Sequence, residues 1–301
     1  MRPGPPRAAL LLFVLGLTLQ TLLAADFGQL TRDGTFKRDP KFLNSDRQLT
    51  YCVDENRVLI RAMKLNLENG TIAPLFKEAN KHQIEPVFAP DGRYLAFTEC
   101  TGNLTAKLVI RDLEKEAAVE IKHSGRGGTR SPTFTPDSKQ VVYAFAETGP
   151  QQLWSVDVDG KNKQQLTESE GINNWPSFTP DGKTIVFSSS RDRNYEIYRM
   201  NADGSDQKRL TQTASMDIRP ALSPDGMRVA FTSNRDGNYE VYVMSANGGE
   251  MIRVTHNEER DDYPCWHPNG RQLVIVSERA GHHDLYLIDV PSEADHVARK
   301  N

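Results

Sequence analysis

The sequence predicts an all-β fold, a six-bladed β-propeller of four-stranded antiparallel blades, closed by an N-terminal strand that completes the last blade. Three observations predict it. Six segments align on a shared proline, and successive prolines are separated by 46, 46, 44, 44 and 44 residues. Each segment has the same order of turn residues and short apolar runs, and a lone copy of the closing run precedes the first segment. The repeats begin near Pro40, Pro86, Pro132, Pro176, Pro220 and Pro264.

The elements of one repeat are clearest in the fourth, which begins "PSFTPDGKTIVFSSS". Strand A carries the proline, and Pro-Asp-Gly makes a tight turn because proline presets a negative φ and glycine accepts a positive one. Strands B and C, "TIVFSSS" and "YEIYRM", are rich in β-branched and aromatic residues. Asp203-Gly204 then turns the chain into strand D, "QKRLT". These four strands form an antiparallel meander.

The residue two positions after each repeat proline predicts how the blades pack. It is large in all six repeats, whereas its neighbours, such as Thr133, Ser177 and Ala221, are mostly small. One meander cannot bury both of its apolar faces, but blades set around an axis bury each face against the next. We therefore expect these large residues in the cores between blades. They are Phe42, Phe88, Phe134, Phe178, Leu222 and Trp266.

The ends of the repeat array predict how the ring closes. The sixth repeat reaches "DLYLIDV" without a clear counterpart of "RLT". Leu30-Thr31 stands ahead of the first repeat proline as Leu210-Thr211 stands ahead of the fifth. The segment from about Phe27 to Thr31 should therefore be strand D of blade six, which removes an exposed sheet edge.

Residues 1–25 have the layout of a secretory signal peptide, with Arg2 and Arg7 before an apolar run that ends in Ala24 and Ala25. A membrane anchor fits less well, because the run is short for a bilayer and contains polar residues. We expect an exported protein, periplasmic or extracellular and without stable membrane insertion, in which residues 26–301 form a single propeller. Cleavage changes the formal net charge from −3 to −5, which argues against a nucleic-acid partner.

The three cysteines, Cys52, Cys100 and Cys265, are too few for a disulfide scaffold in a chain of this length. Cys52 and Cys100 fall near the B strands of adjacent blades. Stacked sheets lie about 10 Å apart, beyond the reach of an ordinary disulfide. We therefore expect free thiols.

The repeated order P-x-F-[ST]-P-D-G, R-D-G-N-x-E-[IV]-Y-x-M and R-L-T resembles the propeller of the periplasmic TolB family. The resemblance is closest from Pro176 to Thr255 and extends more loosely over residues 26–301. It implies a six-bladed exported propeller that binds other proteins, in TolB a peptidoglycan-associated lipoprotein and other envelope components. It concerns the propeller part only, since we find no counterpart of the α/β domain that precedes the propeller in TolB.

A binding site is expected on the loop face, the end of the propeller where the B-to-C and D-to-A loops meet, because these loops are longer and more charged than the opposite turns. The residue three before each repeat proline should form a polar ring at the channel mouth, namely Lys37, Gln83, Thr129, Asn173, Asp217 and Asp261. The competing interpretation is that these side chains brace loops and hold blades together, with arginines paired to the acids. The residues predicted to bind a partner are Asn173, Arg191, Asp217, Arg219, Arg235, Asp261, Arg279, His282 and His283.

No nucleophile elbow, zinc-protease motif or phosphate-binding loop is present. This favours a noncatalytic, monomeric binding protein without a cofactor, whose partner is a protein or peptide. The alternative is an enzyme on the same scaffold, a lyase or hydrolase of acidic oligosaccharides with a loop-face metal. A third possibility is a structural module of a larger complex. The histidines mapped to the loop face are spread around different blades, so we expect no metal site; they are His82, His123, His256, His282 and His283.

Overall fold

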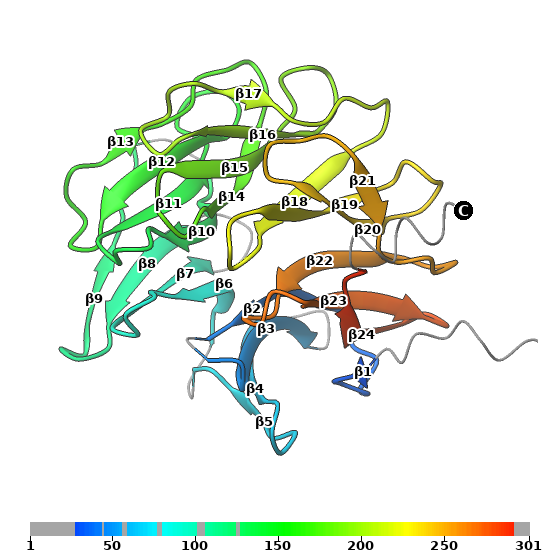
Figure 1. Cartoon of the computed structure of the whole chain (residues 1–301). Coiled ribbons are helices and arrows are strands. Elements are labelled where there is room, and N and C mark those ends of the chain that lie inside the picture. The colour runs from blue at the N-terminus through cyan, green and yellow to red at the C-terminus, as the bar shows by residue number, and fades with distance from the viewer. Residues whose placement is uncertain are drawn as a thin grey trace, which may run out of the picture.

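A computed structural model describes residues 28–43, 45–55, 59–76, 80–100, 106–124 and 127–291 of the chain. Its strands form six four-stranded antiparallel sheets set around a central axis (Figure 1). The predicted all-β, six-bladed fold is confirmed. These residues contain no helix, and so none that is long and apolar enough to span a bilayer. The signal peptide predicted for residues 1–25 lies outside the described residues.

In the first five blades, strands A to D follow one another along the chain. Blade one contains β2 (Lys37–Phe42), β3 (Gln48–Glu55), β4 (Leu59–Asn66) and β5 (Ile72–Pro74). Blade two contains β6 (His82–Phe88), β7 (Tyr94–Cys100), β8 (Lys107–Asp112) and β9 (Ala117–Glu120). Blade three contains β10 (Arg130–Phe134), β11 (Gln140–Phe145), β12 (Gln152–Asp157) and β13 (Gln164–Gln165). Blade four contains β14 (Asn173–Phe178), β15 (Thr184–Ser189), β16 (Glu196–Asn201) and β17 (Lys208–Arg209).

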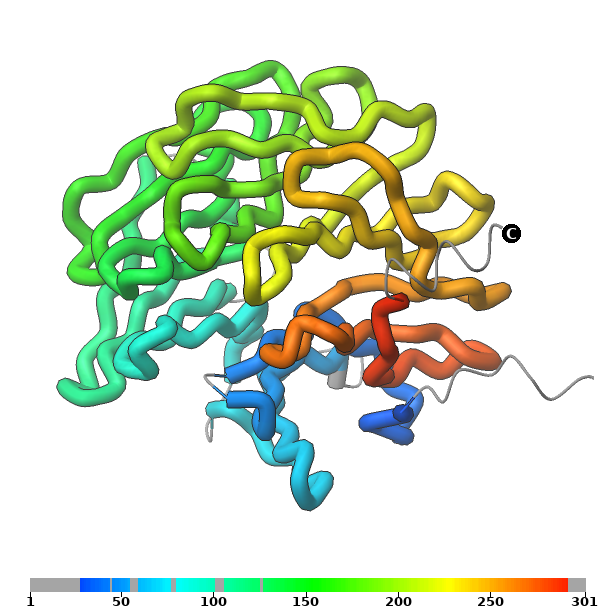
Figure 2. The backbone as a smooth tube through the Cα atoms, viewed as in Figure 1, coloured from blue at the N-terminus to red at the C-terminus, as the bar shows by residue number. Residues whose placement is uncertain are grey.

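Blade five contains β18 (Asp217–Leu222), β19 (Arg228–Ser233), β20 (Glu240–Ser245) and β21 (Met251–Arg253). Blade six contains β22 (Asp261–Trp266), β23 (Gln272–Arg279), β24 (His282–Asp289) and β1 (Gly28–Gln29). Every repeat proline lies in an A strand, the innermost strand of its blade. Figure 2 shows the backbone passing around the ring until its first and last described segments meet in blade six.

The Pro-Asp-Gly turns form for the reason predicted, and the aspartate adds a contact of its own. In blade four, Gly182 has a φ of 70° and its amide donates to the Thr179 carbonyl (2.9 Å). Asp181 Oδ1 accepts from the Lys183 amide (3.1 Å) and from the Thr179 hydroxyl (2.6 Å). The turn is therefore held by both backbone and side-chain bonds.

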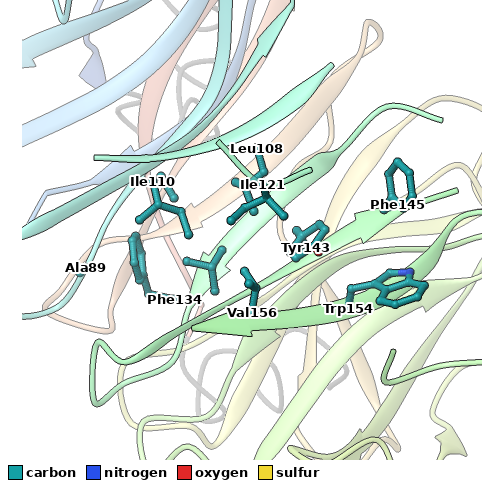
Figure 3. Packing of buried hydrophobic residues seen from close by; sticks show 11 residues of the cluster. Ala89, Leu108, Ile110, Ile121, Phe134, Tyr143, Phe145, Trp154 and Val156 are labelled. Carbon is teal, nitrogen blue, oxygen red and sulfur yellow. The ribbon is translucent and has the colours of Figure 1, made fainter. Parts of the chain in front are cut away.

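The large residues of the A strands pack between blades, as predicted from the pattern. Phe134 shares a core with Ala89 and Ala96 of blade two, and Figure 3 shows this cluster with Ile110 facing the side chains of blade three. Trp266 shares a core with Ala221 and Ala230 of blade five. Its Nε1 donates to the Ala221 carbonyl (2.9 Å), so the indole is both packed and hydrogen-bonded.

The ring closes through β1, which pairs antiparallel with β24. Gly28 lies opposite Leu287 and Gln29 opposite Tyr286, and the Leu30 amide donates to the Leu285 carbonyl (2.8 Å). A segment from the start of the described chain thus supplies the outer strand of the last blade, where the sequence placed it.

The side chain that follows β1 repeats a contact made inside another blade. The Thr31 hydroxyl donates to Asp284 Oδ1 (2.7 Å) and accepts from the Leu285 amide (3.0 Å). In blade four, Thr211 donates to Glu196 Oε2 (2.6 Å) and accepts from the amide of the residue after Glu196 (2.9 Å). Closure therefore uses the same C-to-D brace as an unbroken blade.

Candidate functional site

The six residues predicted to ring the channel mouth lie at or next to the starts of the innermost strands, and all six are buried. Three of them contact the predicted arginines: Arg191 Nη2 donates to Asn173 Oδ1 (2.9 Å), Arg235 Nη2 donates to Asp217 Oδ1 (2.8 Å), and Arg279 Nη2 lies 3.9 Å from Asp261 Oδ1. Each contact joins the start of strand A to the end of strand B, or to the loop after it, in the same sheet. These pairs brace individual blades and do not connect neighbouring ones.

Lys37 joins two blades, as Asn173 does where its Nδ2 donates to Gln152 Oε1 of blade three (2.6 Å). Its ammonium group donates to Asp284 Oδ1 (3.1 Å) and to the His283 carbonyl (3.1 Å), both in blade six. It also donates to Asp33, on the loop between β1 and β2. A buried lysine thus fastens blade one to the closing blade.

Two of the buried acids differ in how well their charge is compensated. Burial raises the pKa of Asp217, although Arg235 Nη2 reaches both of its oxygens (2.8 and 2.9 Å). Burial raises the pKa of Asp261 to about 6, because its main compensation is the Ser277 hydroxyl and the more distant Arg279. Asp261 therefore loses its charge as the pH falls through about 6.

The channel itself is lined two residues further along each A strand, at the residue directly before the repeat proline. All six of these residues have a φ between 51° and 55°. At the same place the A strand shifts its register against strand B, so that two of its residues face one. This is a β-bulge, and proline suits it because proline has no amide hydrogen to place in the ladder. The six residues are Asp39, Glu85, Ser131, Trp175, Arg219 and Tyr263.

A cavity of about 60 Å³ lies at the centre of the ring and is lined by the A strands of all six blades. Asp39 and Glu85, on adjacent blades, form an acidic part of its wall. Trp175, Arg219 and Tyr263, on blades four to six, form an aromatic and cationic part. A volume of this size admits a few water molecules or one extended side chain.

Arg219 is held between the two aromatic rings of this wall. Its guanidinium carbon lies 5.0 Å from the centre of the Trp175 ring and 4.1 Å from that of Tyr263. Its Nη1 also donates to both carboxylate oxygens of Asp262 (3.2 and 3.1 Å), and its Nη2 donates to the Tyr263 hydroxyl (3.2 Å). Arg219 is therefore rigid and its charge is compensated.

Two tyrosines of the B-to-C loops extend this wall toward the loop face. Tyr195 lies 5.7 Å from Trp175, measured between ring centres. Tyr239 lies 4.5 Å from the guanidinium carbon of Arg260, whose Nε donates to Asp262 Oδ2 (3.0 Å). We call this set of half-buried residues the aromatic–arginine band: Trp175, Tyr195, Arg219, Tyr239, Arg260 and Tyr263.

The histidines are not brought together. His82 Nδ1 accepts from the Ile60 amide (3.2 Å), and His123 stacks on Phe145 with 3.5 Å between ring centres. His283 lies edge-on to Phe36, and His282 is exposed at the start of β24. Within the described ranges, no group of three or more His, Cys, Asp or Glu side chains is arranged to hold a metal ion.

The opposite end of the propeller has a shallow groove of about 1,110 Å³ along the tight turns of blades two to four. Its carboxylates are largely engaged by their own turns. Asp91, Asp137 and Asp181 each accept from the backbone amide two residues later.

The three cysteines are free, and burial raises the pKa of all three thiols.

Of the band, the sequence-based prediction included only Arg219. Two signals in the sequence mark the others. The residue before the repeat proline differs in all six repeats, and Tyr195 and Tyr239 recur in "RNYE" and "GNYE".

The fold and this site define a class, a closed six-bladed propeller with a narrow channel and an aromatic, charged wall. The chain matches the family model of the TolB beta propeller domain over residues 48–219, more than half of its length, and it belongs to that family. Residues 202–295 also match the Tricorn protease N-terminal beta propeller domain. The predicted TolB-like character is confirmed.

The chain is 35% identical over 106 residues to a protein TolB homolog of Chlorobium chlorochromatii, a match that covers 33% of this chain and 23% of that protein. A putative TolB from Agrobacterium tumefaciens has a similar structure, with a TM-score of 0.67, 19% identity, and 87% and 93% of the two chains covered. An oligogalacturonate lyase in complex with manganese has a TM-score of 0.60 at 15% identity, covering 89% and 93%. Both structural likenesses concern the fold alone. The match to the curated homolog spans about a quarter of its length.

Proposed function

We propose that this chain is an exported, noncatalytic propeller that binds a protein or peptide partner of the cell envelope at the loop face and channel mouth. Membership of the TolB propeller family supports a protein partner of this kind. The partner-binding surface that we propose is the aromatic–arginine band, together with the exposed loop residues around it.

The composition and rigidity of the band carry the proposal. Tryptophan, tyrosine and arginine contribute most of the binding energy at protein interfaces, and they do so near the centre of the contact. The six band residues lie on blades four to six, along one side of the channel mouth, and are each half-buried. Stacking and the Asp262 carboxylate already hold the two arginines in place, so little side-chain entropy is lost when a partner docks.

Capture from the native envelope fraction tests the proposal. The mature chain is immobilised beside two variants, Tyr195→Ala/Tyr239→Ala and Met227→Ser. Met227 is 69% exposed on a tight turn at the opposite end, so its replacement is a matched surface control. We expect the wild type and Met227→Ser to retain the same macromolecule, and the double variant to bind it at least about tenfold more weakly.

Unfolding curves of all three proteins establish that the variants are folded. A wild type that retains no macromolecule contradicts the proposal. So does a folded double variant that binds as tightly as the wild type.

A further inference from the structure

We infer that the central channel receives a primary ammonium group of the partner, from a lysine side chain or a free amino terminus, between the carboxylates of Asp39 and Glu85. The inference rests on the proposed function, because the partner would insert this group from the mouth where it docks. It adds the chemical identity of the group that enters the channel.

The size of the channel limits what can enter. The cavity measures about 60 Å³ and is bounded by prolines and bulge residues of six strands. A helix or a strand needs far more room, since a helix with its side chains is about 10–12 Å across. One extended alkyl chain with a small head group fits. A lysine side chain and an amino terminus both meet this condition.

The two acids differ in how their charges are compensated. Glu85 Oε2 accepts from the Ser131 amide (2.7 Å), and its Oε1 lies 3.4 Å from Arg130 Nε. The closest cation to Asp39 is Arg38, whose Nε lies 3.7 Å from Oδ2. Among the described residues, no hydrogen bond reaches the Asp39 carboxylate. Of the two carboxylates in the channel wall, Asp39 is therefore the one that an added cation would stabilise more.

The electrostatics of the channel agree with this geometry. Burial and the charge of Glu85 raise the pKa of Asp39 to about 6, and the charges of Arg38, Arg219 and Arg130 offset part of the increase. An ammonium group placed between the two acids would supply the missing charge and three hydrogen-bond donors. It would also lower the pKa of Asp39 toward its ordinary value.

The opposite wall does not favour an anion. Arg219 is the cation closest to the aromatic rings, and it is already bonded to both oxygens of Asp262 and to the Tyr263 hydroxyl. Arg130 faces Glu85. Lys41 also lines the cavity, and it is exposed to solvent. An anion beside the arginines would have to displace one of these pairs, whereas a cation beside Asp39 meets a carboxylate without a hydrogen bond.

The test follows the Asp39 side-chain carboxyl carbon by NMR at pH 7.5 while n-propylammonium is added. We expect a saturable shift that is absent with n-propanol, which has the same length and no charge. The affinity should fall at least about tenfold in Asp39→Asn, followed through Glu85, and stay unchanged in Glu68→Gln, an exposed acid on a turn of blade one. Asparagine tolerates the left-handed backbone at position 39.

Two further probes distinguish the sources of the ammonium group. Nα-acetyl-lysine methylamide presents the side chain, and alanine methylamide presents a free amino terminus. Binding of either probe at Asp39 supports the inference. Binding should weaken as the pH falls through about 6, because Asp39, faced by Arg38, Glu85, Arg130, Arg219 and Tyr263, then loses its charge.

The inference is overturned if no ammonium probe shifts Asp39, if n-propanol has the same effect, or if Ca²⁺ binds there in place of the ammonium group. Its failure is distinct from failure of the proposed function. If the partner is lost in Tyr195→Ala/Tyr239→Ala but fully retained in Asp39→Asn, the proposed docking surface is supported and the ammonium site is refuted.

Discussion

Replacing Thr31 by valine tests the contact that closes the ring. Valine has nearly the same shape as threonine, so the change removes the hydroxyl and little else. Two hydrogen bonds are lost: the one donated to Asp284 Oδ1 (2.7 Å) and the one accepted from the Leu285 amide (3.0 Å). Thr31 is buried, so water cannot replace either partner without opening the blade.

The expected cost follows from these two bonds. A hydrogen bond to a charged group contributes about 1.5–3 kcal/mol, and a buried amide left without a partner costs about 1–3 kcal/mol. Asp284 keeps its contact with Lys37 (3.1 Å), so its charge remains partly compensated. We expect Thr31→Val to lower the free energy of unfolding by about 2–4 kcal/mol.

Thr211→Val is the matched control, because Thr211 makes the same two bonds in blade four. Thr211 follows β17, which pairs with β16 inside blade four, whereas Thr31 follows β1, which closes the ring by pairing with β24. Urea unfolding measures the global cost of each change. Hydrogen exchange of the Leu30 amide, which is bonded to the Leu285 carbonyl, measures release of the closing strand.

We expect the Leu30 amide to exchange at least about 30-fold faster in Thr31→Val and to be unchanged in Thr211→Val. Equal exchange rates in wild type and Thr31→Val would refute the assignment of closure to this side chain. If Thr211→Val accelerated exchange of the Leu30 amide equally, the loss of protection would be general and not specific to the closing strand.

Three further predictions concern other buried contacts. Asp261→Asn should raise the free energy of unfolding at pH 8 by about 1–3 kcal/mol and flatten its pH dependence. The folded pKa of Asp261 is raised from 3.8 to about 6, so the wild type gains stability as the pH falls from above 6 toward 4. Urea titrations across this range check the sign, and a variant less stable than the wild type at pH 8 would contradict the prediction. Lys37→Met should lower the free energy of unfolding by about 3–5 kcal/mol because it leaves Asp284 buried without its cation. The double variant Lys37→Met/Asp284→Asn should recover most of this stability, and a double variant no more stable than Lys37→Met argues against the pair. Trp266→Ala should cost about 3–5 kcal/mol in calorimetry, since it empties a core between blades, and a loss below about 1 kcal/mol would mean that this indole is not part of the packing.

The candidate site could be predicted only in part, and the reason is local. The pattern identified the loop face and Arg219, but it placed the channel ring three residues before the proline, at positions that the structure buries. An uninterrupted strand alternates its faces with a period of two residues. The bulge inserts one extra residue before each proline, and this changes which side chain reaches the channel.

The sequence alone determined the number of blades, their strand order, the packing of Phe134 and Trp266 between blades, and the closing role of the segment around Thr31. These features follow from periodicity and turn chemistry, which are local and recur in every repeat. Only the tertiary structure decided that Asp39 and Glu85 share one cavity and that Tyr195 continues the wall begun by Trp175. Those contacts join residues tens of positions apart, and they exist because the ring brings six copies of one strand to a common axis.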